Sequence, residues 1–105
     1  MKNLEKIICA SNYYNDGIVY THSPKNITIG YVICGRRHHN CLQTFAQIYG
    51  FPYNEKALTI MQTEVEGFMT SENRFLDRKE AYIVALKANQ ISTKGKEYLY
   101  SEDLY

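Results

Sequence analysis

The 105-residue chain has no tryptophan, only three cysteines, and a formal net charge of only +1. An odd, small number of cysteines is not the pattern of a secreted disulfide framework. A net charge near zero provides no extended basic face, which argues against binding to a DNA or RNA polymer. No apolar run is long enough to span a membrane, and the charged start of the chain does not read as a signal peptide. We therefore expect a soluble intracellular protein that does not bind membranes.

The composition fits one folded domain over residues 1–105. Hydrophobic residues make up 45% of the chain and charged residues 22%. That apolar content is enough to offset the entropy lost on ordering the chain, so disorder is not expected. A chain of this size buries only part of its surface, and self-association would add stability. Ten tyrosines suit surfaces that pack and form hydrogen bonds at the same time.

The first part of the chain has the signals of β-structure. Lys6–Tyr14 is rich in residues that favour strands, and Asn15–Gly17 is a turn signal. Ile18–His22 is then expected to pair with the first strand, and Ile27–Gly35 to be extended. Thr63–Thr70 reads as a further strand.

Two segments have helical periodicity. Asn40–Tyr49 places its apolar residues on one face and is followed by Gly50, a common residue at a helix end. Arg78–Ala88 is preceded by Asp77, which can cap the helix while Glu80 returns the hydrogen bond. The pattern predicts an α+β fold, with an antiparallel β-sheet and two main helices packed on it in a single small domain.

The segment "VICGRRHHNC" suggests three kinds of site. Cys34, His38, His39 and Cys41 could be metal ligands, but four ligands within eight residues would strain the loop, and no second cluster completes the set. We expect no metal and no cofactor. Cys41, in the first turn of the helix, is the one plausible nucleophile. Cys34 follows apolar residues and is expected to be buried.

The third kind of site is an anion site. Arg36, Arg37, His38 and His39 lie between a strand that ends at Gly35 and the first helix. The start of a helix exposes unpaired backbone N–H groups, and arginine can bind phosphate with two hydrogen bonds. The alternative is a solvated basic turn. The pattern leaves open which of the two arginines faces a ligand.

A second basic turn opens the second helix, with Arg74, Arg78 and Lys79. Cations at a helix start oppose the helix dipole unless an anion or a nearby carboxylate compensates them. The two capping carboxylates could do this internally. Phe75 is either the hydrophobic contact that fixes this helix start or an exposed ring for a nucleotide base. Two arginine turns with aromatic residues would suit a nucleotide or pyrophosphate.

Four stretches, "GRRHH", "EGFMTSENRFLDRKEA", "ANQI" and "LYSEDLY", resemble the small phage Thoeris anti-defence proteins of the first described type. The resemblance implies a sponge that sequesters a cyclic ADP-ribose isomer made by a TIR-domain defence enzyme, without degrading it. It also implies homodimers that form larger oligomers such as hexamers, and cyclic trinucleotides bound at separate sites in some members. The place of action would be the cytoplasm of the infected bacterial host.

On this resemblance the ligand-binding residues are Arg37, His38, His39, Thr70, Arg74, Phe75, Arg78 and Gln90. The alternative function is a hydrolase or phosphodiesterase for a cyclic nucleotide, with His38, His39 and Cys41 as catalytic candidates. A third possibility is an inhibitor that binds a host protein through the tyrosine-rich surface. A sponge needs affinity for the ground state of its ligand, whereas an enzyme must bind the transition state more tightly.

Overall fold

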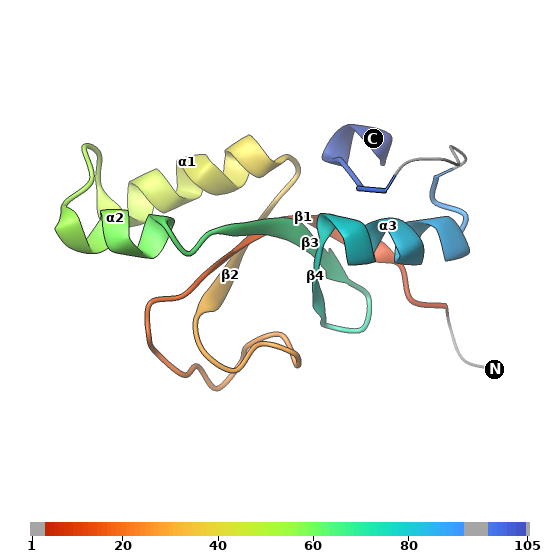
Figure 1. Ribbon diagram of the computed structural model, residues 1–105, viewed down its shortest axis with the longest axis horizontal. Helices are drawn as coiled ribbons and strands as arrows, with labels where there is room; N and C mark the ends of the chain where they lie inside the picture. Colours follow the sequence, from red (N-terminus) through yellow and green to blue (C-terminus); the bar gives the residue numbers. More distant parts are fainter. Residues whose placement is uncertain (1–3, 92–96, 105) are drawn as a thin grey trace.

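The computed structural model describes residues 4–91 and 97–104, in which two strands are followed by two helices, two further strands and a third helix (Figure 1). In chain order the elements are β1 (Ile7–Tyr14), β2 (Tyr31–Gly35), α1 (His38–Tyr49), α2 (Glu55–Met61), β3 (Val65–Thr70), β4 (Phe75–Asp77), α3 (Arg78–Lys87) and a short 3-10 helix, η1 (Ser101–Asp103). The predicted α+β class is confirmed: a small domain in which helices pack against a sheet.

The strands form one antiparallel sheet in the order β2-β1-β3-β4. In the middle strand, Ser11 lies opposite Cys34 of β2 on one side and opposite Gly67 of β3 on the other. β1 and β3 fall within the strands predicted at Lys6–Tyr14 and Thr63–Thr70, as expected from their aromatic and β-branched residues. The sheet therefore joins segments from both halves of the chain.

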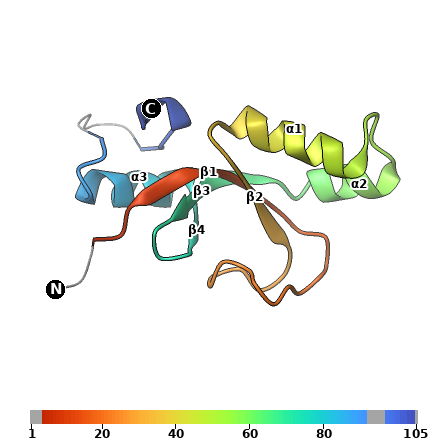
Figure 2. The ribbon, with the colours of Figure 1, turned by 180° about the vertical axis from the view of Figure 1, so that it is seen from behind.

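α1 and α3 pack on the same face of this sheet. Ala10 and Tyr14 of β1 share a face because side chains alternate along a strand. Ala10 belongs to a buried cluster with Ala85 of α3, and Tyr14 packs on Phe45 of α1, with ring centroids 4.6 Å apart. The core thus has two parts on one face, and the figures show α1 and α3 toward opposite ends of the molecule (Figures 1 and 2).

The start of α3 is the one predicted from its capping residues. The Asp77 carboxylate accepts a hydrogen bond from the Glu80 backbone N–H at 2.8 Å, and the Glu80 side chain accepts one from the Asp77 backbone at 3.2 Å. The helix ends at Lys87, within one residue of the prediction. This reciprocal cap is a local arrangement, so the sequence was sufficient to locate it.

α1 begins two residues earlier than predicted, at His38 rather than Asn40. The Asn40 side chain accepts a hydrogen bond from the Arg37 backbone N–H at 3.0 Å, which makes Arg37 the residue before the helix. Both histidines are consequently helical rather than part of the connecting turn. At the other end, Gly50 has a positive φ of 79° and closes the helix, as expected.

The predicted strand at Ile18–His22 is wrong, and only Tyr31–Gly35 of the predicted extended segment is a strand. The Asn15 and Asp16 side chains accept hydrogen bonds from the backbone N–H groups of Gly17 and Ile18, which closes local turns instead of a hairpin. Residues 15–30 form an irregular loop, drawn in orange below the sheet in Figure 1.

The sequence pattern did not predict two of the elements, α2 and β4. Asn54 caps α2 by accepting a hydrogen bond from the Ala57 N–H at 2.8 Å, but the segment is only 7 residues long and gives little periodicity. β4 has 3 residues and pairs with β3. Gly67 makes this pairing possible, since a Cβ there would lie 2.0 Å from the Leu76 carbonyl oxygen.

Candidate anion-binding site

Three of the predicted site residues meet where α1 and α3 begin. Arg37 precedes α1, His38 is its first residue, and Arg78 is the first residue of α3. The Arg78 Nη2 lies 3.2 Å from the His38 Nδ1. In Figure 1 the starts of both helices lie over the middle of the sheet, near the C-terminal turn η1. The two basic turns therefore contribute to one cluster, which we call the arginine–histidine cluster (Arg37, His38 and Arg78).

The strand register explains why these helix starts are neighbours. Gly35, the last residue of β2, pairs with Ala10 of β1. Asp77, the last residue of β4, pairs with Gly67, which pairs with Ser11. Since Ala10 and Ser11 are adjacent, both strands end at the same level of the sheet. Each is followed by a helix on the same face, so their first turns come together.

His38 is the buried centre of the cluster, with 8% of its surface exposed. Its Nε2 lies 2.9 Å from the Gly67 carbonyl oxygen, which can only accept a hydrogen bond. Nε2 therefore carries the proton, and Nδ1 accepts the hydrogen bond from Arg78. Burial lowers the pKa of His38 below its ordinary value of 6.5, and the nearby Arg78 charge lowers it too, although the Gly67 contact opposes this. His38 is neutral at pH 7 and orients Arg78.

Arg78 has three partners besides His38. It forms an ion pair with Glu66 at 3.0 Å and donates to the Leu99 carbonyl oxygen at 2.9 Å. Its guanidinium also lies over the Tyr100 ring, 4.8 Å from the ring centroid. Only 19% of the Arg78 side chain is exposed, so its direction is fixed by these contacts.

The C-terminal segment completes the cluster. Arg37 donates from Nη1 to the Ser101 hydroxyl at 3.3 Å, and 46% of Tyr100 is exposed. Glu66, Tyr100 and Ser101 had no predicted role, because nothing in their local sequence indicates that they reach two distant helix starts. The arrangement brings together guanidinium donors, the starts of two helices and an exposed aromatic ring. These groups suit a phosphate next to a flat base.

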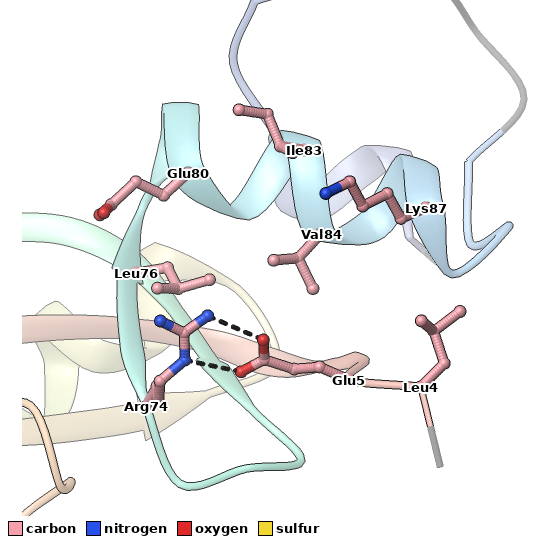
Figure 3. A pocket seen from close by; sticks show the side chains of 8 residues that line it. All are labelled: Leu4, Glu5, Arg74, Leu76, Glu80, Ile83, Val84 and Lys87. Carbon is pink, nitrogen blue, oxygen red and sulfur yellow. Dashed lines mark hydrogen bonds and ion pairs between the residues drawn. The ribbon is translucent and has the colours of Figure 1, made fainter. Parts of the chain in front are cut away.

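The other predicted residues of the second turn form a separate cluster around Glu5. Arg74 donates to both Glu5 carboxylate oxygens, from Nε at 2.9 Å and Nη2 at 2.7 Å (Figure 3). Thr70 is buried and donates to Glu5 at 2.7 Å. The Arg74 guanidinium and Thr70 hydroxyl lower the pKa of Glu5 to about 2, against the effect of burial. This pair, the Glu5–Arg74 pair, lines a hollow of about 370 Å³ beside α3.

Phe75, Gln90 and His39 lie outside the arginine–histidine cluster. Phe75 is 7% exposed and packs on Tyr13, with centroids 6.1 Å apart, so its ring is not open to a base. Gln90 holds the start of β1, with hydrogen bonds of 2.7 and 2.8 Å to the Ile7 backbone. His39 is exposed in the first turn of α1. Phe75 therefore has a packing role and Gln90 fixes the start of β1, whereas neither role applies to His39.

The cysteines differ from expectation in one respect. Cys34 is exposed rather than buried, because it points to the sheet face opposite α1 and α3 while its neighbour Ile33 points inward. Cys41 is fully buried, and burial raises its pKa to about 11. A buried, protonated thiol cannot readily act as the nucleophile of the alternative hydrolase or phosphodiesterase. Within residues 4–91 and 97–104, no three His, Cys, Asp or Glu side chains are grouped to hold a metal ion.

Comparison with known proteins identifies the family. The family model of the phage T4 y16D protein matches residues 6–105, nearly the whole chain. The chain belongs to the phage T4 y16D protein family. The name of the y16D family gives a phage origin and states no activity. No curated protein and no solved structure matches the chain. In the described part of this y16D family member, no helix is long and apolar enough to cross a membrane.

Proposed function

We propose that the protein binds and sequesters a cyclic ADP-ribose-type immune signal at the arginine–histidine cluster. The signal is held intact, and TIR-dependent anti-phage defence is blocked because the downstream effector never receives it. The protein acts in the cytoplasm of the infected bacterial host. The proposal includes cyclic trinucleotides as further ligands at separate sites.

The observation that carries the proposal is the 3.2 Å contact between His38 and Arg78, which joins the two basic turns. Arg37 and Arg78 can bind the pyrophosphate, since guanidinium groups and helix starts both favour phosphate oxygens. Tyr100 already lies against Arg78 and is 46% exposed, so an adenine can stack on its ring. His38 holds Arg78 in place without adding a charge of its own.

The resemblance to Thoeris anti-defence proteins and the phage family support this choice of ligand and target. A pre-organised site with most of its donors fixed before binding suits capture, because little entropy is lost when the ligand arrives. The proposed assembly is a homodimer or a higher oligomer, with a hexamer as the larger form, since a neighbouring subunit could close a site on the surface of so small a chain.

The first test is release of intact signal. The protein is mixed with a limiting amount of a purified cyclic ADP-ribose isomer, the unbound fraction is assayed, and the protein is then denatured by heat. We expect depletion at a fixed stoichiometry, followed by recovery of the intact nucleotide. Depletion without recovery, or turnover of nucleotide in excess over protein, would instead establish the hydrolase or phosphodiesterase alternative.

Native mass spectrometry tests the assembly in the same experiment. We expect an oligomer of this chain whose mass increases by whole numbers of intact ligand. A monomer that binds no nucleotide but captures a host protein would support the third possibility, an inhibitor of a protein partner.

A further inference from the structure

Cys9, Ser11 and Cys34 lie together on the sheet face opposite α1 and α3. Ser11 is directly across from Cys34 in the β1–β2 pair, and Cys9 is two residues along the same strand. Side chains two residues apart on a strand share a face. Cys34 is exposed and Cys9 is half-buried, whereas Cys41, a residue of α1, is buried. The two strands thus present a pair of thiols toward solvent, apart from the arginine–histidine cluster.

The two thiols have different acidities because they interact. A hydrogen bond from the Cys9 thiol lowers the pKa of Cys34 to about 7, although burial opposes this. The same hydrogen bond, together with burial, raises the pKa of Cys9. At neutral pH more of Cys34 than of an ordinary cysteine is therefore thiolate, the reactive form.

Ser11 adds a hydrogen-bonding group beside the pair. Its side chain is fully buried, and its hydroxyl has no hydrogen-bond partner among the described residues. A buried hydroxyl without a partner is costly and uncommon in native proteins. It can donate to an oxygen atom carried by the Cys34 sulfur, directly across the strand pair.

We propose that Cys9 and Cys34 form a dithiol that hydroperoxides oxidise to a disulfide between β1 and β2. In the first step the Cys34 thiolate attacks the terminal peroxide oxygen, the O–O bond breaks, and an alcohol or water leaves once it has taken a proton. Cys34 is then a sulfenic acid, whose oxygen accepts the Ser11 hydrogen bond. In the second step the Cys9 sulfur attacks the Cys34 sulfur, the S–O bond breaks, and water leaves.

The electron balance is closed by the oxidant. One hydroperoxide accepts two electrons from two thiols, and the products are one disulfide, one water and one alcohol or second water. Loss of the Cys34 negative charge in the first step also removes a cause of the high pKa of Cys9, so Cys9 can ionise and complete the second step.

The test uses the full chain at pH 7 with hydrogen peroxide, followed by iodoacetamide and peptide mass spectrometry. We expect a Cys9–Cys34 disulfide and a Cys41 that is alkylated only after unfolding. We also expect native Cys34 to be alkylated about ten-fold faster than an unperturbed thiol at pH 7, because far more of it is thiolate. Alkylation and oxidation of Cys34 no faster than those of free cysteine would overturn the proposal.

Three variants separate the roles, each checked for native circular dichroism. Cys9→Ala should shift the pH midpoint of Cys34 alkylation upward and leave a sulfenic acid that dimedone traps. Cys34→Ser should abolish disulfide formation, and Cys41→Ala, the matched control, should leave it unchanged. Wild-type protein in which Cys34 passes to the sulfinic acid while Cys9 stays a thiol would show that Cys9 does not resolve it, which also overturns the proposal.

Discussion

Arg74 and Arg78 are four residues apart in one basic turn, yet they lie in different surroundings. The Arg74 guanidinium forms a two-point pair with one carboxylate, since both oxygens of Glu5 accept its hydrogen bonds. Arg78 divides its contacts among Glu66, His38, the Leu99 carbonyl and the Tyr100 ring. A guanidinium fully paired with one carboxylate stabilises the fold, whereas one held by several partial contacts can exchange some of them for a ligand. Arg74 therefore stabilises the fold, and Arg78 is the arginine that we propose for ligand binding.

The largest expected effect is on ligand affinity in Arg78→Ala. Loss of charge-assisted hydrogen bonds to phosphate should weaken binding of the cyclic ADP-ribose isomer about 100-fold, or about 2.7 kcal/mol. Isothermal titration calorimetry measures this, with Lys79→Ala as the matched control, because Lys79 is the exposed neighbour and carries the same charge. Equal losses in both variants would mean that only general charge matters.

The next effect is on stability in Arg74→Ala. The free energy of unfolding, measured in urea, should fall by about 1–2 kcal/mol. This value is reduced for solvent screening, because 37% of the Arg74 side chain is exposed. Ligand affinity should change less than about two-fold, since the Glu5–Arg74 pair lies outside the arginine–histidine cluster. A large loss of affinity with unchanged stability would reverse the assignment of the two arginines.

The Glu5–Arg74 pair should also make the stability of the protein depend on pH in acid. Glu5 has a pKa of about 2 in the folded chain and an ordinary value of 4.5. Its contribution to stability is therefore fully present above pH 4.5 and is lost as the pH falls toward 2. The difference in unfolding free energy between wild type and Arg74→Ala should shrink over this range. A difference that stays constant down to pH 2 would show that Glu5 ionisation is not its source.

A smaller loss of affinity is expected for Tyr100→Ala. Removal of the ring that lies against Arg78 should weaken binding about five-fold, roughly 1 kcal/mol, and Tyr100→Phe should retain most of the affinity. Tyr98 offers a matched control, because it is also 46% exposed in the same segment. If Tyr98→Ala weakens binding as much as Tyr100→Ala, the base does not stack on Tyr100 specifically.

The smallest effect is the pH dependence contributed by His38. Because its pKa is lowered in the folded chain, the unfolded chain takes up a proton below pH 6.5 before the folded chain does. Stability should therefore fall as the pH drops from 7.5 to 5.5. Urea unfolding midpoints of wild type and His38→Gln, measured at both pH values, isolate the contribution of His38. The fall in stability that is due to His38 should be absent in the variant. An equal fall in both proteins would show that other groups titrate.

Features decided by near neighbours in the chain could be predicted from the sequence. Asp77 and Glu80 form the expected cap because the groups that bond are three residues apart. The apolar pattern at Ile18–His22 suggested a strand, but side chains of the preceding turn accept backbone hydrogen bonds and close local turns instead. Arg74 and Arg78 share one motif and one local charge pattern, so the sequence does not distinguish their roles.

The α+β class, the strands around Ala10 and Gly67, and the start of α3 could all be predicted from the chain, because periodicity and capping act within a few residues. Which basic residues lie together depends instead on how the sheet is assembled. Strand register brings the ends of β2 and β4 to one level, and a helix on the same face follows each. Arg37, His38 and Arg78 become neighbours for that reason, while pairing with Glu5 holds Arg74 apart. Contacts between residues so far apart in the chain depend on the whole sheet, and no local pattern specifies them.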